Sequence, residues 1–571
     1  MAFLDNALTG RDEYVTGSIA SEATAGPVIN KGGGMSETPA PGVPAAIHTT
    51  EDEQILHKLG YAQELFRAMG GFQNFAISFT IISILAGCLT SYYIAFLQGG
   101  PIAVTWGWLL VGLMSTIVAL SMAEIASAYP TAGGLYYWAS KLGSPAWGWF
   151  TGWFNLIGQI AVTAAIGYGL ATFGTVLLNY WFSYPNTKEY IYLLYAIVLL
   201  AALVLNLLNV KITSLLNTIS AYWHIIGVVI IVGALVVIPD NHQSLGYVFT
   251  DTINETGFGG GGSTFATPMF WYVFATGLAM AQYTITGYDA SAHMAEETHG
   301  ASRMAAVGMV MAVVVSVIVG FVLLVAITFA IPDTAGAIEN FGIIIPWIWT
   351  ESMSQNWSEA LLFIVVVAQF FCLTASVTSA SRMMFAFSRD RAVPGHNLWR
   401  KVGRNRVPHY AVIAICVLAA IIMLPAIKNY LVGYYVGTGI AVVGLYIAFI
   451  LPVILRFRQG DKFQHGAWSL GNNYKWLNLI AIIWVGFICI VFFLPPYKVS
   501  IPGQEGWSWD FVNYAPVLVA AAFVLFGGWW VVSAKNWFKG PVRMGTEEEL
   551  ELLEEKEAAG FDLPADTQYE T

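Results

Sequence analysis

Charged residues are scarce in this chain: Asp, Glu, Lys and Arg together make up 11% of its 571 residues. Soluble domains carry about 25% charged residues, and here 57% of the residues are apolar, so the composition excludes a soluble globular protein. Cysteine is also rare. Cys88, Cys372, Cys416 and Cys489 all lie inside apolar runs without C-x-x-C spacing. We therefore expect neither disulfide bonds nor a zinc site.

Nucleotide-binding and catalytic motifs are missing as well. The sequence contains no G-x-x-x-x-G-K-[ST] motif, and its glycine-rich run at 257–262 lacks the lysine of a phosphate-binding loop. We interpret that run as a flexible loop. No set of clustered histidine ligands and no nucleophile beside a base is found. The sequence therefore predicts no enzymatic activity, no cofactor, no metal ion and no nucleic acid partner.

The two ends of the chain differ in composition from the rest. Residues 1–60 are rich in Gly, Ala, Thr, Ser and Pro, and predict a disordered N-terminal tail. Residues 541–571 form an acidic C-terminal tail, in which leucines at helical spacing among glutamates favour a short solvated helix over a partner site. More than half of the 35 acidic residues lie in these two tails, so the apolar body between them is mildly basic.

Between the tails, twelve apolar stretches are long enough to cross a membrane, because about 20 residues of helix span about 30 Å of hydrocarbon. None alternates with period two, which argues against membrane strands. The stretches lie near residues 72–97, 103–127, 146–178, 190–209, 217–238, 269–293, 304–331, 358–388, 409–427, 430–455, 474–494 and 513–534. We therefore predict an all-α integral membrane protein with twelve transmembrane helices in residues 61–540.

The distribution of basic residues predicts the orientation. If the chain begins in the cytoplasm and crosses at every stretch, all but three of its 25 Lys and Arg residues fall on the cytoplasmic side. The three exceptions are Lys188, Lys428 and Lys498. Cytoplasmic loops of membrane proteins carry an excess of basic residues. This split supports the span count and predicts two cytoplasmic termini in a multi-pass protein of the plasma membrane.

Two spans contain polar residues and glycines at mid-depth. The first has Ser83 and Gly87 near its middle, and the sixth has Thr286 and Gly287 followed by Asp289. These spans begin two blocks of five helices, and an odd number of crossings gives the blocks opposite orientations. Matched interruptions in inverted blocks predict a five-plus-five inverted repeat with a binding site between broken helices 1 and 6.

Two ionisable residues inside spans are candidates for function. Asp289 is costly to insert, by at least ~2.5 kcal/mol, so it needs a partner or water. It could bind a substrate ammonium group, carry a proton, or make a structural hydrogen bond. His224 lies well inside the fifth span and can change charge near neutral pH. It is a candidate for energy coupling, and a neutral histidine that donates to a carbonyl explains it equally well.

Other polar residues cluster at the end of the sixth span. His293, Glu296, Glu297 and His299 favour a solvated or gate-locking network over a metal site, because H-E-x-x-H is absent. Glu124, close to the cytoplasmic boundary, is interpreted as a structural or gating carboxylate. Four polar residues inside spans are candidates to line a binding site or to make interhelical hydrogen bonds: Asn155, Gln159, Tyr283 and Gln369.

Three segments of this sequence resemble a known family. They are AEIASAYPTAGGLYYWASKL after the second span, GYDASAHMAEET in the sixth, and SRMMFAFSRDRAVP at the end of the eighth. Together they resemble the amino acid, polyamine and organocation (APC) permease superfamily. The similarity is greatest to its amino acid and choline branch, which includes gamma-aminobutyrate and choline permeases. It covers roughly residues 60–540.

The resemblance implies a twelve-helix secondary transporter with alternating access. In such permeases, backbone amides of the broken first helix bind a carboxylate, and carbonyls of the broken sixth helix bind an amine. The residues placed at the two breaks by this resemblance are Ser83, Leu85, Ala86 and Gly87, then Thr286, Gly287, Tyr288 and Asp289. Asn155 and Tyr283 are further candidates for substrate binding, and Tyr136 falls at an inner gate.

One departure from the family pattern bears on the substrate. Many members have a glycine-rich triplet at the first break, where this chain has Leu85-Ala86-Gly87. Only the last glycine remains, which favours gamma-aminobutyrate, choline or a polyamine over an ordinary alpha-amino acid. His224 falls where some proton-coupled relatives place a basic side chain. Thr378 and Ser379 provide the adjacent hydroxyls that sodium-coupled relatives use.

These observations lead to one functional hypothesis and several alternatives. We expect an importer of an amino acid or amino-bearing solute similar to gamma-aminobutyrate, coupled to protons through His224 or Asp289. The alternatives are a choline or polyamine permease, sodium-coupled or exchange transport through Thr378 and Ser379, and, from a different class, a channel. The expected partners are the small-molecule substrate, protons or sodium ions, and membrane lipid. The sequence specifies no oligomeric state.

Overall fold

The computed structural model describes residues 50–208, 210–261, 267–428 and 430–558. Most of the predicted N-terminal tail lies outside these residues, but its last part is a helix, α2 (Glu51–Leu59). Thr50 and Glu53 form a capping box at its start, and Gly60 ends it with a φ of 100°. The disordered tail predicted for residues 1–60 therefore extends too far, because its residues 51–59 form a helix.

The described residues are helical, with no β-strand among them, as the sequence predicts. Ten helices are long and apolar enough to cross a membrane. They are α3 (Gly71–Ile82) with α4 (Gly87–Thr90), α6 (Pro101–Ala128), α8 (Pro145–Phe182), α9 (Lys188–Leu207), α10 (Val210–Val237), α15 (Ala301–Phe329), α18 (Gln355–Arg389), α21 (Tyr430–Gln459), α22 (Tyr474–Phe493) and α23 (Ala515–Trp529). Such helices are stable in lipid because they satisfy their own backbone groups.

The sixth and ninth predicted spans fall below this length because each is interrupted. The sixth consists of three short helices, α12 (Pro268–Gly277), α13 (Ala279–Thr284) and α14 (Ala290–His293). The ninth is α20 (His409–Ile422), followed by a 3-10 turn that contains Pro425. Proline cannot donate a backbone hydrogen bond and disfavours the interior of an α-helix, and here the α-helix has already ended at Ile422, before Pro425. The exact count of twelve spans stays a prediction.

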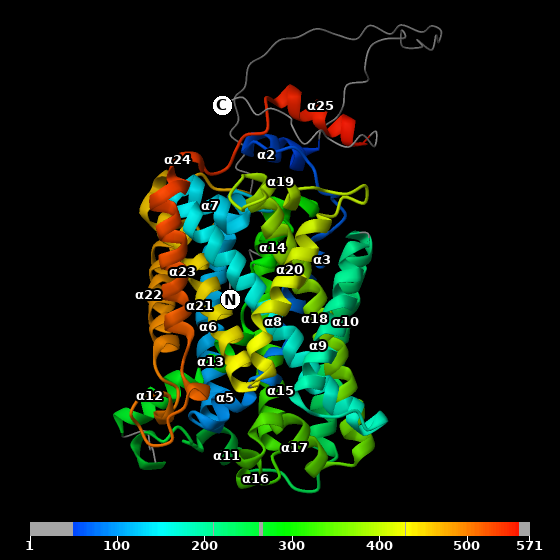
Figure 1. Ribbon diagram of the computed structural model, residues 1–571, viewed down its shortest axis with the longest axis vertical. Helices are drawn as coiled ribbons and strands as arrows, with labels where there is room; N and C mark the ends of the chain where they lie inside the picture. Colours follow the sequence, from blue (N-terminus) through cyan, green and yellow to red (C-terminus); the bar gives the residue numbers. More distant parts are fainter. Residues whose placement is uncertain (1–49, 209, 262–266, 429, 559–571) are drawn as a thin grey trace, which may run out of the picture. The chain divides into compact units, whose positions relative to one another are not determined.

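Shorter helices lie at the two ends of the bundle (Figure 1). One end, called the α2 end here, carries α2 together with α7 (Gly134–Leu142), α19 (His396–Trp399) and α24 (Lys535–Trp537). The opposite end, called the α11 end, carries α11 (Leu245–Thr250), α16 (Thr334–Glu339) and α17 (Ile344–Ser352). The acidic helix predicted near the C-terminus is α25 (Glu547–Ala558).

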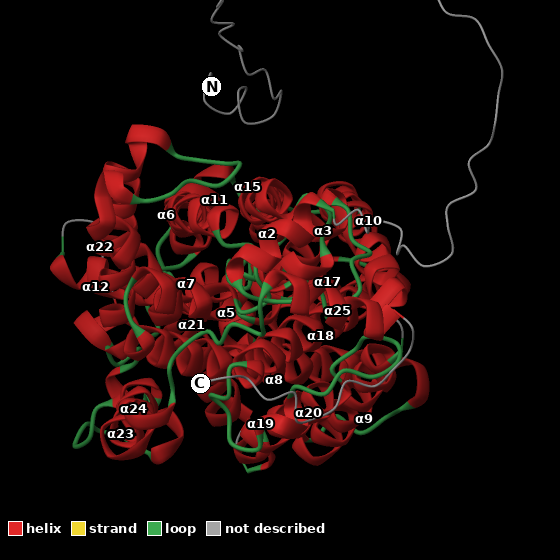
Figure 2. Ribbon diagram, turned by 90° about the horizontal axis from the view of Figure 1, so that it is seen from above, coloured by secondary structure: helices red, strands yellow, loops and turns green. Residues whose placement is uncertain are grey.

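Burial separates an inner set of helices from an outer set. The apolar part of α8 is fully buried, and α8 packs against both α18 and α21. By contrast, α9, α10, α22 and α23 lie at the rim of the bundle (Figure 2). They present large apolar side chains such as Leu200, Val229 and Val524, which are 60%, 68% and 75% exposed. An apolar surface of this kind requires lipid around it.

Candidate functional site

The first span is broken at the residues that the sequence predicts. Helix α3 ends at Ile82, and Ser83 adopts the left-handed conformation with a φ of 35°. Helix α4 starts at Gly87 and is followed by α5 (Tyr92–Leu97). The Ser83 carbonyl accepts hydrogen bonds from the amides of Ala86 and Gly87, at 2.8 and 2.9 Å. These two amides, which the resemblance assigns to a substrate carboxylate, are therefore already bonded.

The sixth span is broken between α13, which ends at Thr284, and α14, which begins at Ala290. The Tyr446 hydroxyl of α21 donates to the Ile285 carbonyl at 2.9 Å, and the Thr286 hydroxyl donates to the Gln282 carbonyl at 2.6 Å. Tyr288 packs against Phe449, with ring centroids 5.1 Å apart. Side chains thus satisfy part of the backbone that the break frees, as a membrane interior requires.

The two breaks pack against each other. Gly287 has a φ of 89°, and a Cβ atom there would lie 2.4 Å from Ile81. A Cβ atom on Gly87 would lie 2.8 Å from Thr284. The Ser78 hydroxyl of α3 donates to the Tyr288 carbonyl at 2.9 Å. Each break therefore contacts the helix that ends at the other, and both glycines are required by this close approach.

Asp289 is fully buried and accepts hydrogen bonds from two amide side chains of α8. The Asn155 Nδ2 and Gln159 Nε2 atoms lie 3.1 and 2.8 Å from Asp289 Oδ2. His293 Nε2, one helical turn further along, lies 3.3 Å from the same oxygen. Asp289 Oδ1 is buried and has no hydrogen-bond partner among the described residues. The carboxylate thus lies where α8 meets the second break.

His293 connects Asp289 to the loop before α7. Its Nδ1 atom lies 3.0 Å from the Ala132 carbonyl oxygen. In the same loop Gly134 has a φ of 46°, and a Cβ atom there would lie 3.2 Å from the imidazole ring. The Ala132 amide donates to Glu296 Oε1 at 2.9 Å. The P-T-A-G-G segment therefore holds His293 through its backbone.

His224, the predicted coupling residue, lies beside the first break. Its Nε2 atom lies 2.7 Å from Ser83 Oγ, and its Nδ1 atom lies 2.8 Å from the Ser220 carbonyl. A neutral imidazole satisfies both contacts, because Nδ1–H donates to the carbonyl and Nε2 accepts from the Ser83 hydroxyl. No carboxylate of the described residues forms an ion pair with it.

The predicted sodium ligands lie on α18. The Thr378 hydroxyl donates to Asn206 Oδ1 of α9 at 2.6 Å, and Ser379 Oγ has no hydrogen-bond partner among the described residues. Both side chains are buried. The structure thus turns the Thr378 hydroxyl toward α9, and not toward its neighbour Ser379.

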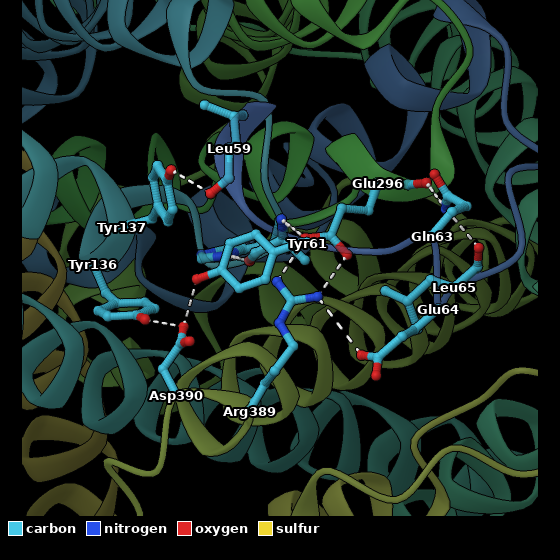
Figure 3. A network of polar contacts seen from close by, with 12 residues as sticks. Leu59, Tyr61, Gln63, Glu64, Leu65, Tyr136, Tyr137, Glu296, Arg389 and Asp390 are labelled. Atoms are coloured by element: carbon cyan, nitrogen blue, oxygen red, sulfur yellow. Dashed lines mark hydrogen bonds and ion pairs between the residues drawn. The ribbon is translucent and has the colours of Figure 1, made fainter. Parts of the chain in front are cut away.

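Tyr136, the predicted gate residue, lies in a polar network at the α2 end (Figure 3). Its hydroxyl donates to Asp390 Oδ2, which also accepts from the Tyr61 hydroxyl at 2.7 Å. The backbone amide of Val542, in the segment after α24, donates to Asp390 Oδ1 at 2.9 Å. Burial raises the pKa of Asp390 above its ordinary value, although Arg389 and these donors oppose the rise.

Buried ion pairs close the same end of the bundle. The Arg389 guanidinium binds Glu296 through two hydrogen bonds of 2.8 and 3.1 Å and lies 3.7 Å from Glu64 (Figure 3). Arg382 Nε donates to Glu297 at 2.7 Å. Burial raises the pKa of Glu64 above its ordinary value. These contacts support the gate-locking interpretation of Glu296 and Glu297, which are buried and not solvated.

Glu124 takes part in a separate buried pair. Its Oε2 atom accepts from Arg456 Nε of α21 at 2.8 Å, and its Oε1 atom accepts from the Leu470 amide at 3.1 Å. Glu124 therefore joins α6 to the end of α21 and to the loop that follows. No group of three or more His, Cys, Asp or Glu residues in the described part of the chain could hold a metal ion.

A pocket opens between α5, α12, α13, α21 and the end of α22. Its lining is mostly apolar and includes Gln98, Thr276, Tyr283 and Asn513. The backbone of Gln98 forms an isolated antiparallel β-bridge with Asn254, which follows α11 by a few residues. The pocket therefore lies in the half of the bundle toward the α11 end. Tyr283 is the last residue but one of α13. The pocket therefore comes within two residues of the second break, from the α11 end of the bundle.

Sequence reasoning missed several residues of this site. His293 was grouped with Glu296 and Glu297, although its i, i+4 spacing from Asp289 was a usable signal for a direct contact. No local sequence pattern reveals the hydrogen bond from the Tyr446 hydroxyl to the Ile285 carbonyl, because the two residues are 161 positions apart in the sequence. Gln159 was considered only as a general lining residue.

Comparison with known proteins agrees with this architecture. Residues 69–523 match the family model described as amino acid permease. The chain is 38% identical over 509 residues to the amino-acid permease BAT1 homolog of Oryza sativa subsp. japonica, which covers 85% of this chain and 95% of that protein. It is 35% identical to amino-acid permease BAT1 of Arabidopsis thaliana, over 85% and 95% of the two chains. A GABA-specific permease of Saccharomyces cerevisiae is 27% identical, over 91% and 90%.

The chain therefore combines two mutually packed broken helices, a bundle with an apolar rim and a family match over most of its length. Members of this family are transporters and not enzymes. The protein is a multi-pass membrane protein that belongs to the amino acid permease family of the APC superfamily.

Proposed function

We propose that this permease imports an amino acid or amino-bearing solute similar to gamma-aminobutyrate by proton-coupled alternating access. The observation that carries this proposal is the buried carboxylate of Asp289 at the second break. One of its oxygens has no partner among the described residues. A buried, unpaired carboxylate oxygen is costly, and a substrate ammonium group would remove that cost.

The state of the two ends supports alternating access. The α2 end is closed by buried ion pairs and by the tyrosines on Asp390, whereas the pocket reaches Tyr283 from the α11 end. We assign the α2 end to the cytoplasm, because the basic residues predicted to be cytoplasmic, such as Lys58 and Lys141, belong to α2 and α7. In this assignment the plasma membrane protein has cytoplasmic termini and a closed inner gate containing Tyr136.

The substrate class follows from the chemistry of the breaks. The proposed substrate ammonium group lies at Asp289, near the backbone of Thr286, Gly287 and Tyr288. The amides of Ala86 and Gly87 are occupied by the Ser83 carbonyl, so a carboxylate close to the amine, as in an alpha-amino acid, finds no free donor there. This favours a solute whose carboxylate is distant from its amine. The GABA-specific permease among the relatives points in the same direction.

A second candidate is an amine without any carboxylate, such as choline or a polyamine. The same occupied amides favour it, because such a solute needs an acid at one break and no donor at the other. We retain proton coupling as the proposed energy source, and transport in sodium-free proteoliposomes distinguishes it from sodium coupling through Thr378 and Ser379. His224 contacts Ser83 and the Ser220 carbonyl as a neutral hydrogen-bonding residue, and we give it no part in substrate binding.

The experiment is a thermal-shift panel followed by transport in proteoliposomes. The panel contains alpha-amino acids, gamma-aminobutyrate, choline and a polyamine, because only ligands of the folded state raise the melting temperature. We expect gamma-aminobutyrate to stabilise the protein and to show saturable uptake with counterflow. Stabilisation by choline or the polyamine alone would favour the second candidate. Linear, non-saturating flux without counterflow would instead indicate a channel and overturn the proposal.

A further inference from the structure

His293 and Asp289 make a contact that a neutral histidine cannot satisfy. The Ala132 carbonyl oxygen can only accept, so the His293 Nδ1 atom 3.0 Å away carries a hydrogen. A neutral imidazole with Nδ1–H has a lone pair on Nε2. That atom lies 3.3 Å from Asp289 Oδ2, which also presents lone pairs. One more proton between the two atoms turns this repulsion into a hydrogen bond.

The donors around Asp289 place that proton on the histidine. Asp289 Oδ2 already accepts from Asn155 and Gln159, as an ionised carboxylate does. We propose that His293 and Asp289 together are the proton-binding site of this transporter, with the proton on His293 Nε2. This inference rests on the proposed proton-coupled import, and it assigns the coupled ion to a site different from His224.

The other buried acidic and basic side chains near His293 and Asp289 pair with one another, so His293 is the ion-pair partner of Asp289. The elements that pack most closely against α14 are α3, α7, α15, α18 and the turn after α14, and α3 has no titratable side chain. The titratable groups on the others are Tyr136, Tyr137, Lys141, Arg303, Glu359, Cys372, Arg382, Arg389, Glu296 and Glu297. Helix α8, which contacts Asp289 through Asn155 and Gln159, carries only Tyr168 and Tyr180 as titratable groups. Glu296 pairs with Arg389, and Glu297 pairs with Arg382. Among the described residues, His293 is the one cationic side chain within ion-pair distance of Asp289.

Loss of this proton must break one of two bonds. A neutral His293 can donate either to Ala132 from Nδ1 or to Asp289 from Nε2, but not to both. Ala132 belongs to the loop that leads into α7 and its gate residue Tyr136, and the Ala132 amide binds Glu296. The proton thus ties the Asp289 carboxylate, to which we assign the substrate ammonium group, to the loop before the gate residue Tyr136. It enters with the substrate from the α11 end and leaves when the α2 end opens, which releases the loop.

The second buried histidine lacks these features. Both nitrogens of His224 are satisfied in the neutral form, by the Ser220 carbonyl and the Ser83 hydroxyl. His224 and His293 are both fully buried, so the two are a matched pair for substitution.

The transport test compares His293→Gln with His224→Gln in sodium-free proteoliposomes. The readout is the ratio of labelled gamma-aminobutyrate accumulated under an inward gradient of one pH unit to that accumulated at equal pH. One pH unit corresponds to about a tenfold accumulation per coupled proton. We expect a ratio of about ten for the wild type and for His224→Gln, and about one for His293→Gln. A ratio of about ten in His293→Gln overturns the proposal.

A second measurement needs no substrate. Nitrogen NMR of 15N-histidine-labelled protein in lipid reports whether each imidazole carries one or two protons. We expect the spectra of the wild type and of His224→Gln to contain one doubly protonated histidine signal that is absent from the spectrum of His293→Gln. If that histidine is missing from the wild type, or persists in His293→Gln, the proposal is wrong. The two proposals can also fail separately. If the doubly protonated histidine is present but wild-type uptake does not respond to the pH gradient, proton-coupled import is wrong, whereas the assignment of a proton to His293 is retained.

Discussion

Gly287 lies directly against Ile81, so that a methyl group on Gly287 would be 2.4 Å from the Ile81 Cγ2 atom. The reciprocal contact, Gly87 against Thr284, has the same character on the other broken helix. Backbone can approach a neighbouring helix this closely only where a Cβ atom is missing. The two breaks are therefore held together by shape as well as by the hydrogen bond from Ser78 to Tyr288.

Gly287→Ala is expected to abolish uptake and to lower the melting temperature. A φ of 89° suits only glycine, a left-handed backbone costs other residues roughly 1–2 kcal/mol, and Ile81 would have to move. Gly233→Ala in α10 is the control, because a Cβ atom there meets nothing within 4 Å. Melting curves and uptake by both variants check this. Wild-type uptake by Gly287→Ala would show that the breaks can separate without loss of function.

Asp289→Asn is expected to abolish uptake while expression and melting temperature stay close to wild type, because His293 can lose its proton in this variant and no buried charge is left unpaired. The amide keeps one oxygen for Asn155 and Gln159 but loses the charge that binds ammonium. Uptake and thermal stability are measured on the same preparation, with exposed Asp461→Asn as the control. Normal uptake would exclude Asp289 from the substrate site, and a protein that fails to fold would assign it a structural role.

Glu296→Gln is expected to destabilise the closed gate. Removal of one partner leaves Arg389 buried with only Glu64, at 3.7 Å, and breaking a buried pair costs roughly 3–5 kcal/mol. The double variant Glu296→Gln/Arg389→Gln should recover part of the loss, because no unpaired charge remains. Melting temperatures of both single variants and the double variant complete the cycle. Strictly additive changes would mean that the two residues do not act as a pair.

Asp390→Asn is expected to flatten the dependence of stability on pH. Burial raises the pKa of Asp390 above 3.8, so the folded state binds this proton more tightly than the unfolded state. The contribution of Asp390 is therefore fully present below pH 3.8 and is lost as the pH rises through the raised value. Melting temperatures of wild type and variant, taken across that window, check the difference. Equal slopes would assign the pH dependence to other groups.

Much of the fold follows from the sequence because each span carries its own apolar signal. The breaks were also predictable, since Ser83 with Gly87 and Thr286 with Gly287 interrupt otherwise apolar helices. The partners of the broken segments were not, because Asn155 and Gln159 belong to a helix more than 100 residues away from Asp289. Local patterns report which residues share a helix face, whereas contacts between helices depend on packing of the whole bundle.

Helix α2 was missed for a different reason. It has nine residues in a polar segment, so it lacks the apolar stripe on which span prediction depends. Its local signal was the Thr50–Glu53 capping box. Its tertiary support is a contact between His57 and Glu554 of α25, at 2.8 Å, which no local pattern reveals.

The bond from the Val542 amide to Asp390 also has a consequence for biosynthesis. Residue 542 leaves the ribosome after every span has been made, so the gate aspartate lacks this donor throughout insertion into the membrane. A chain that stops short of Val542 would carry every predicted membrane span but would lack α25 and the amide that bonds Asp390 Oδ1. The bonding of Asp390 at the α2 end therefore depends on a residue that is translated after the last predicted span.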